Sequence, residues 1–356
     1  MKTITKEFSP VVSYDLSRLG DPERLLFFDI ETTGLSAKRD MIYLIGCVYR
    51  RDGIWHMKQW FADSAGAEAE LLVHFFLFAA RFSLLVHFNG SAFDLPFLEE
   101  RASRHHTPVP GRMPESLDLY RELRPLKKLL GLPDCRQKTL ENLLRTGRED
   151  PYDGGQLIRF YRQYLRTGEA ALCSALLLHN EEDVRGLPAL LSLLSFRDFF
   201  HGSFLPGSEQ QTGPEELLVT CRSVSEILPV PCRFRSGSFL VSCRESGLTL
   251  RIPLLEDTLK YFFGKPADYY YLPEEDRAIH KSVASFVDPS HRKKATAKTC
   301  YQKHAGRFIP LPPGMETDLP LFYPEYKKNP PYAEYSEGLF LDAAFLQKFL
   351  LATFSG

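Results

Sequence analysis

The sequence predicts an α/β domain built on a mixed β-sheet flanked by helices, followed by a second, smaller α+β domain. Three apolar runs, at residues 25–30, 41–48 and 54–61, read as the strands of a meander. Beyond residue 67 the pattern alternates short strands with helices, which is typical of α/β sheets. Near residue 200 the sequence pattern changes, and most of the elements expected after that point are strands.

The remaining elements of the first domain follow from their local patterns. Asp94 opens a helix in which Pro96 fits the first turn, where a missing N–H is tolerated. After the meander we expect a helix, a strand, a helix, a strand and then three helices, at residues 67–81, 84–88, 94–106, 117–119, 138–144, 156–166 and 169–194. This order predicts one sheet with helices packed against it.

A polar segment marks the expected domain boundary. Residues 201–216 (HGSFLPGSEQQTGPEE) are rich in Gly, Ser, Pro and Gln and predict a linker. The first domain would then span residues 1–200 and the second residues 217–356. In the second domain we expect strands within 217–254, an aromatic loop and short helix at 266–285, an irregular proline-rich stretch at 310–331 and an amphipathic helix at 339–354.

Composition places the chain among ordinary globular proteins. Of its 356 residues, 44% are hydrophobic and 25% are charged, and a net charge of -1 creates no overall attraction to nucleic acid or membrane. The seven cysteines lack C-x-x-C spacing, which predicts reduced thiols. No apolar run reaches the ~18 residues of a membrane span, and the N-terminus lacks a signal-peptide core. We therefore expect a cytoplasmic protein with no membrane partner.

Acidic side chains in the first domain have the spacing that a metal site needs. Asp29 and Glu31 are two apart on a strand-like run, so they leave the same face of the sheet. His179 and Asp183 are four apart on a helix-like run and share one helix face. With Asp94, these carboxylates predict a site for Mg²⁺ or Mn²⁺, since both ions favour oxygen ligands.

Three motifs in residues 25–195 resemble those of the DEDD superfamily of 3′–5′ exonucleases, which have a ribonuclease H-like fold. DIETTG is similar to the first motif, HFNGSAFDLPFL to the second and HNEEDV to the third. Within that superfamily the chain is most similar to the YprB-like ribonuclease H-like domain, through FDLPFL, Asp118-Leu119, KTLENLL, RTGREDPYDGG and FYRQYLRTGE. Three motifs in the right order are a far more specific signal than one.

The resemblance implies a hydrolase that cuts the phosphodiester bonds of single-stranded DNA or RNA with two metal ions about 4 Å apart. Asp29 would bridge both ions. Glu31 and Asp183 would complete the first metal site, and Asp94 would hold the second ion through water. His179 would be the general base. The spacing His179-x-x-x-Asp183 is that of the subgroup whose residue at this position is tyrosine. Histidine is the residue of the other subgroup, which usually has one more residue between the two.

Residues beside the carboxylates predict contacts with substrate. The turn Thr32-Thr33-Gly34 offers N–H groups and hydroxyls to a terminal nucleotide, and Gly34 permits close approach. Asn89 and Phe93 suit the sugar-phosphate and the base, because aromatic stacking tolerates any sequence. Glu181 and Glu182 read as a solvated helix face.

A basic segment in the second domain is the strongest charge feature. Residues 281–310 carry seven basic side chains against Asp288, with Phe286, Tyr301 and Phe308 interleaved. Basic charge with aromatic faces is what grooves for single-stranded nucleic acid use. A solvated loop and helix face is the alternative interpretation.

Two other classes of function fit the same sequence. One is a nucleic-acid-binding module without turnover, in which metal ions only stabilise the fold. The other is an endonuclease on the same fold, which a circular substrate would reveal because it has no end. The sequence leaves open whether the polymer is DNA or RNA, and it leaves the oligomeric state and protein partners open.

Overall fold

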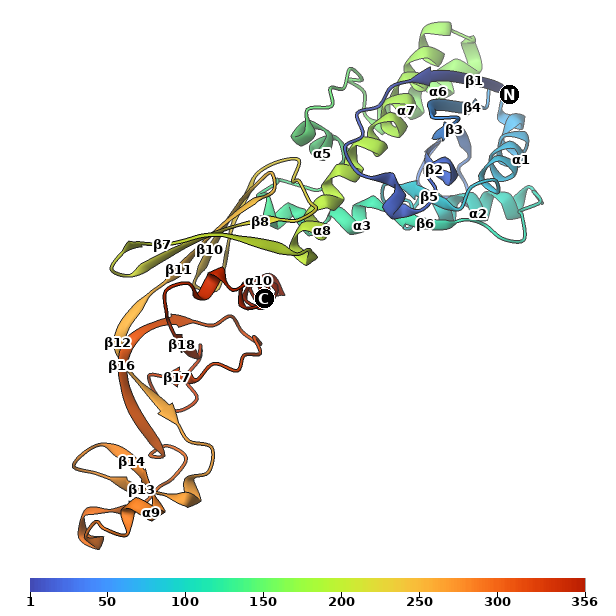
Figure 1. The fold of residues 1–356 in the computed structure, drawn as a ribbon. Coiled ribbons are helices and arrows are strands. Elements are labelled where there is room, and N and C mark those ends of the chain that lie inside the picture. Colours follow the sequence, from blue (N-terminus) through green and yellow to red (C-terminus); the bar gives the residue numbers. More distant parts are fainter. Residues whose placement is uncertain (356) are drawn as a thin grey trace. The chain divides into compact units, whose positions relative to one another are not determined.

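The computed structural model describes residues 1–355, and the chain divides into two compact units, Met1–Ser195 and Phe196–Gly356. Each unit has its own sheets and core (Figure 1). The first unit holds the four carboxylates of the predicted metal site, Asp29, Glu31, Asp94 and Asp183.

The first unit is built on a six-stranded mixed sheet in the order β1-β4-β3-β2-β5-β6. The first four strands of this order pair antiparallel, whereas β2–β5 and β5–β6 are parallel. The strands are β1 (Lys2–Phe8), β2 (Leu25–Thr32), β3 (Ile42–Arg51), β4 (Ile54–Phe61), β5 (Leu84–His87) and β6 (Glu115–Asp118). The predicted mixed sheet is confirmed.

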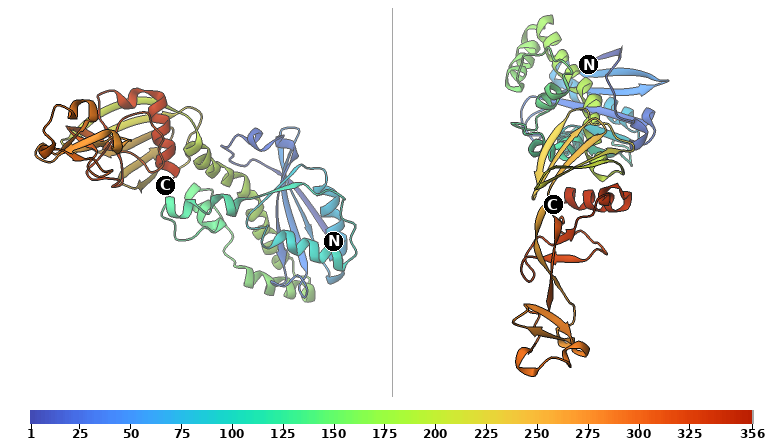
Figure 2. Two further views of the ribbon diagram at one scale, coloured as in Figure 1. Left: turned by 90° about the horizontal axis from the view of Figure 1, so that it is seen from below. Right: turned by 60° about the vertical axis from the view of Figure 1, so that its left-hand side comes forward.

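Helices flank this sheet (Figure 2). They are α1 (Glu68–Ala79), α2 (Asp94–Arg104), α3 (Leu119–Leu123), α4 (Leu126–Leu129), α5 (Gln137–Leu144), α6 (Gly154–Thr167) and α7 (Ala170–Leu190). Helix α7 contacts β2, β3 and β4, and α6 packs beside it.

Alternation along β2 assigns a different role to each face of the sheet. Phe28 is fully buried and its ring lies 5.4 Å from that of Phe75 on α1. The next residue, Asp29, points to the opposite face and meets Asn180 on α7. Because side chains alternate along a strand, Glu31 shares the α7 face with Asp29. The sheet therefore presents a hydrophobic face to α1 and its acidic residues to α7.

Strand β1 was not expected from the sequence. It pairs with β4 over its whole length, from Lys2 opposite Phe61 to Phe8 opposite Trp55. Most of its residues are exposed, since it is an edge strand. Without a buried face, it lacks the apolar alternation that identifies a strand.

The second unit contains three β-layers. A five-stranded sheet has the order β7-β8-β11-β10-β9, a closed barrel has β12-β16-β18-β17, and a small sheet has β14-β13-β15. Its strands are β7 (Phe204–Gly213), β8 (Glu216–Ser223), β9 (Cys232–Ser236), β10 (Phe239–Arg244), β11 (Gly247–Pro253), β12 (Leu255–Phe262), β13 (Tyr269–Leu272), β14 (Arg277–His280), β15 (Lys293–Lys294), β16 (Tyr301–Pro310), β17 (Leu321–Tyr323) and β18 (Tyr332–Glu334). Its helices are α8 (Ser195–His201), α9 (Lys281–Ala284) and α10 (Ala343–Ser355).

The predicted linker at residues 201–216 is wrong. Residues Phe204–Gly213 form β7, which pairs with β8 and bends at two irregularities in register, near Gly207 and Thr212. Strand β7 is at the edge of its sheet, so it tolerates the Pro and Gly residues that suggested a linker. The expected aromatic loop at 266–285 is likewise a β-hairpin, β13–β14, before the short helix α9.

Two simpler expectations can be compared with the structure. All seven cysteines are buried and unbonded, as their spacing predicted. Among residues 1–355, no helix combines the length and the apolar character that crossing a membrane requires.

Candidate active site

Strand β2 and helix α2 bring two of the acidic motifs together. Asp29 and Glu31 lie on β2, and Asp94 begins α2. The backbone N–H of Ile30, between the two β2 carboxylates, donates to Asp94 Oδ1 at 3.2 Å. Asp118 accepts the N–H groups of Asn89 (2.8 Å) and Ser91 (3.2 Å), which fixes the loop before Asp94.

Helix α7 supplies the third acidic motif. His179 Nε2 lies 3.2 Å from Asp183 Oδ2 and 3.6 Å from Glu31 Oε1. Glu31, His179 and Asp183 each offer an atom, and these atoms lie within 4.8 Å of one another. The spacing of four residues therefore directs His179 toward the carboxylates.

A buried polar chain holds Asp29 in place, and the sequence did not reveal it. Asn180 Nδ2 donates to Asp29 Oδ2 at 3.1 Å. Gln59 on β4, which is fully buried, donates to Asn180 Oδ1 at 3.0 Å. Gly46 lies opposite Asp29, and a Cβ there would come within 2.0 Å of Asn180 Oδ1. A glycine on β3 is therefore required for α7 to approach this closely.

The α5–α6 loop (residues 145–153) supplies two further residues that the sequence did not single out as site residues. Arg148 Nη1 lies 2.5 Å from Asp183 Oδ1, and Arg148 also pairs with Glu141 and Asp150 at 3.3 Å. Asp150 Oδ2 lies 2.5 Å from His179 Nδ1, and the Asp150 side chain is fully buried. The loop therefore contacts both predicted site residues of α7, His179 and Asp183.

The interpretation of Glu181 and Glu182 as a solvated face is wrong. Glu182 accepts the N–H groups of Glu149 (2.8 Å) and Asp150 (2.9 Å), so it anchors the α5–α6 loop to α7. Glu181 is 9% exposed and pairs with Lys6 on β1 at 2.7 Å. Both roles depend on segments far away in the sequence, which helical periodicity does not report.

The family model of the RNase H superfamily matches residues 26–195. This match covers all three acidic motifs and, apart from Leu25, strands β2–β6 of the sheet, whereas β1 lies outside it. Residues 26–195 form a ribonuclease H-like domain, which we call the RNase H domain because of its similarity to that superfamily. The motifs and their order are consistent with its DEDD exonucleases, and the narrower resemblance to YprB-like proteins stays a prediction. No curated protein matches the chain.

Several solved structures are similar to the chain at low identity. The family B DNA polymerase of the archaeon Pyrobaculum calidifontis is 15% identical, with a TM-score of 0.41 over 74% of this chain and 40% of the polymerase. Exonuclease I of E. coli with a dA16 oligonucleotide is 12% identical, with a TM-score of 0.34 over 56% of this chain and 54% of exonuclease I. NrnC of Brucella melitensis with bound Mg²⁺ is 20% identical, with a TM-score of 0.32 over 50% of this chain and 76% of NrnC. The chain thus spans about half or less of the first two proteins.

The carboxylates of the candidate site repel one another when no cation is bound. Burial, and then the charges of Asp94 and Asp183, raises the pKa of Asp29 well above its ordinary value. Burial and Asp183 do the same to Glu31, and burial raises the pKa of Asp94 to about 7. Burial by itself would also raise the pKa of Asp150, but the Tyr152 N–H and His179 outweigh it and hold that pKa below its ordinary value. The three β2 and α2 carboxylates are therefore costly to ionise together.

The donor set of the RNase H domain fits hard divalent cations. Carboxylate oxygens are the ligands that Mg²⁺ and Mn²⁺ prefer, and an imidazole nitrogen is compatible with Mn²⁺. Among the lysines and arginines of residues 1–355, only Arg148 forms an ion pair with any of the four carboxylates, and its partner is Asp183. A divalent ion would relieve the remaining repulsion.

The predicted substrate residues surround the carboxylates, but several of their polar groups are engaged. Thr32 Oγ1 donates to the carbonyl of Gly34 at 2.7 Å, and Thr33 Oγ1 accepts the Met41 N–H at 3.0 Å. The close approach at Gly34 is made by Asp40, whose carboxyl carbon would lie 2.5 Å from an added Cβ. The tight turn is thus stabilised internally, and its contact with nucleotide stays a prediction.

The loop before α2 presents the other two predicted substrate residues. Asn89 has a positive φ of 63°, and Phe93 packs against Phe97 with ring centroids 5.3 Å apart. Neither observation tests a contact with nucleic acid, so both roles stay predictions.

The basic segment at 281–310 is less available than its sequence indicated. Tyr301 and Phe308 are buried, so only Phe286, at 91% exposure, presents an open aromatic face. Lys281 pairs with Asp268 at 3.3 Å and Lys303 with Asp276 at 2.5 Å. The segment therefore has fewer uncommitted charges than a solvated loop would.

Proposed function

We propose that the RNase H domain is a divalent-metal-dependent nuclease that removes nucleotides from the 3′ end of single-stranded DNA or RNA. The observation that supports the proposal most is the meeting of Asp29, Glu31, Asp94 and Asp183, which come from three separate elements. Gathering carboxylates in a partly buried site is expensive, and cation binding is their common use. The direction of attack and the single-stranded substrate rest on the DEDD resemblance.

The four carboxylates have distinct roles in this proposal. Glu31 and Asp183 would hold one ion and Asp94 the other, with Asp29 shared between them. When bound, such ions activate a water molecule and stabilise the leaving oxygen of the phosphodiester. Asn180 orients Asp29 through its 3.1 Å hydrogen bond, so the shared ligand has one preferred rotamer.

His179 would accept the proton of the attacking water at Nε2. Its Nδ1 faces the buried carboxylate of Asp150 at 2.5 Å, so the proton of the neutral ring belongs on Nδ1. That tautomer leaves the Nε2 lone pair directed toward the carboxylate cluster. Asp150 is then a positioning residue, since it acts on the reaction only through His179.

The terminal nucleotide would lie against the β2 turn and the loop before α2. Backbone groups of Thr32, Thr33 and Gly34 and the side chains of Asn89 and Phe93 are the proposed contacts. Backbone donors and an aromatic face recognise any nucleotide, which suits an enzyme that degrades strands of any sequence.

Digestion of end-labelled strands tests the proposal. Single-stranded DNA and RNA of one sequence, labelled at the 5′ end, are incubated with the protein in Mg²⁺, Mn²⁺ or EDTA. A metal-dependent ladder that shortens from the 3′ end is expected for the parent and for Asp52→Asn, an exposed-turn control. Asp29→Asn keeps the size of the side chain but removes a charge, and it should abolish the ladder.

Other outcomes would contradict the proposal in distinct ways. Cleavage of a circular single strand would identify an endonuclease. Intact substrate in every lane, with salt-sensitive binding, would favour a binding module. Equal digestion by the parent and Asp29→Asn would exclude the two-metal mechanism at these residues.

A further inference from the structure

The five-stranded sheet of the second unit has two faces of opposite character. One face is apolar and packs on α10, with the rings of Phe239 and Phe349 5.2 Å apart. The other face, which we call the arginine face, carries three hydroxyl residues and five arginines on β8–β11: Thr220, Ser242, Thr249, Arg222, Arg233, Arg235, Arg244 and Arg251. All five arginines are exposed. Strand alternation alone accounts for the separation of the two faces.

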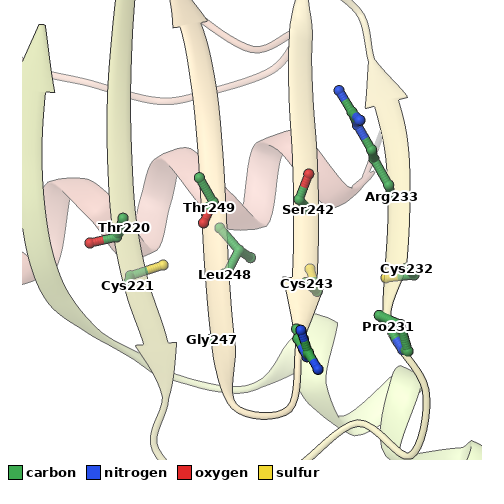
Figure 3. A pocket seen from close by; sticks show the side chains of 11 residues that line it. Thr220, Cys221, Pro231, Cys232, Arg233, Ser242, Cys243, Gly247, Leu248 and Thr249 are labelled. Carbon is green, nitrogen blue, oxygen red and sulfur yellow. The ribbon is translucent and has the colours of Figure 1, made fainter. Parts of the chain in front are cut away.

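Cross-strand pairing arranges these side chains in rows. Arg222 and Arg244 both lie opposite Gly247, which leaves space between the two guanidinium groups. In the next row Thr220 pairs with Thr249, Thr249 with Ser242, and Ser242 with Arg233. Figure 3 shows this hydroxyl row on the side of the sheet away from the helix. Apart from Arg222, the residues of the two rows line a shallow concavity of about 550 Å³.

Most of the charge on this face is uncompensated. Arg251 pairs with Glu216 at 2.6 Å. Within residues 1–355, Arg222, Arg233, Arg235 and Arg244 form no ion pair or side-chain hydrogen bond. Each of the four lies opposite an uncharged residue, Gly247, Ser242 or Leu240. Four free guanidinium groups on one sheet face create a local positive field that favours an anionic ligand.

We propose that the arginine face binds the phosphate backbone of a single-stranded nucleic acid. A guanidinium group donates two parallel hydrogen bonds to the oxygens of a phosphate, and hydroxyl groups also donate to phosphate oxygens. The hydroxyl row crosses four strands that are about 4.8 Å apart. A ligand therefore needs several phosphates in series to engage both rows. The choice of a nucleic acid strand over another polyanion rests on the proposed function, because a nuclease that works from a strand end gains from holding the strand elsewhere.

The binding surface can be tested without cleavage. The full-length protein is titrated into a fluorescent 20-nucleotide oligo-dT in EDTA, and anisotropy is measured at several salt concentrations. Two double variants, Arg222→Gln/Arg244→Gln and Arg233→Gln/Arg235→Gln, are compared with a charge-matched control, Arg159→Gln/Arg166→Gln on α6. Circular dichroism melting verifies that each variant is folded. Folding is expected to be retained because the substituted side chains are exposed.

The expected effect is a loss of both affinity and salt dependence. Each arginine-face double variant should weaken binding about tenfold and lower the salt slope by about 1.4, since each phosphate contact with a single strand contributes roughly 0.7. The α6 control should bind like the parent. A triple variant of the small sheet region, Lys293→Gln/Lys294→Gln/Lys298→Gln, tests the rival basic segment.

Three results would overturn the inference. They are parent-like binding by both arginine-face variants, loss of binding only in the lysine variant, and equal affinity for a duplex of the same length. Failure here is separable from failure of the proposed function. If the parent digests the strand and the arginine variants bind it like the parent, only this inference is contradicted. If binding depends on the arginines but no digestion occurs, only the nuclease proposal is contradicted.

Discussion

Replacing Asp94 by Asn should stabilise the metal-free protein while it abolishes activity. Burial raises the pKa of Asp94 from 3.8 to about 7 in the folded state, so the folded protein binds this proton more tightly than the unfolded chain does. The stability gained from that proton is fully present below pH 3.8 and is lost as the pH rises through about 7. At pH 7.5 the charged carboxylate is therefore a cost to folding.

The size of this cost has an upper bound. A rise in pKa from 3.8 to about 7 corresponds to roughly 4 kcal/mol at most. Asn keeps an oxygen that can accept the Ile30 N–H, but its amide nitrogen also needs a partner in a buried position. We therefore expect a net gain of about 1–2 kcal/mol, which is a rise in Tm of about 2–8 °C for a domain of this size.

Thermal unfolding in EDTA at pH 7.5 and pH 5 measures the effect. Asp94→Asn should melt above the parent at pH 7.5, and the difference should shrink toward pH 5, where the parent carboxyl is protonated. Mn²⁺ should raise the Tm of the parent more than that of the variant. Asp118→Asn is the matched control: Asp118 accepts N–H groups with both oxygens, so this variant should be destabilised at both pH values. A Tm for Asp94→Asn at or below that of the parent at pH 7.5 would refute the reasoning.

Three further predictions concern the surroundings of the carboxylates. Asp150→Asn should lower kcat by about 10²-fold or more with little change in KM, because His179 loses the carboxylate that orients it; Mn²⁺ affinity measured by calorimetry should be retained. Gly46→Ala should destabilise the protein by about 1–3 kcal/mol in chemical denaturation and reduce activity, because the new Cβ displaces Asn180. Tyr161→Phe should cost about 1 kcal/mol, through loss of the 2.9 Å bond to the Ala62 carbonyl, and leave the cleavage rate unchanged.

Local pattern was sufficient to predict most of the first unit. Strand β2 and helix α7 both have long apolar runs, and their periodicities place Asp29 beside Glu31 on one strand face and His179 beside Asp183 on one helix face. The structure shows these side chains close together. Their chemical roles stay predictions, since geometry alone does not test catalysis.

The missed features depend on partners that are distant in the sequence. Asn180 and Gln59 look like ordinary polar residues of a helix and a strand until the sheet and α7 pack together. Asp150 lies in a loop without periodicity, and its partner is 29 positions away. Strand β7 was hidden because an edge strand with one mostly exposed face needs few apolar residues.

The hydrogen bond between Asn180 and Asp29 joins residues far apart in the sequence, which has a consequence for biosynthesis. The two residues are 151 positions apart, and α7 carries the proposed base His179 together with Asn180 and Asp183. At a synthesis rate of about 5–20 residues per second, roughly 8–30 s separate the emergence of β2 from that of α7. By the end of that interval the nascent chain holds three of the four proposed metal ligands, Asp29, Glu31 and Asp94, but lacks the helix that completes the site. A ribosome-bound chain would therefore gain the proposed nuclease activity only after α7 has emerged and docked on β2.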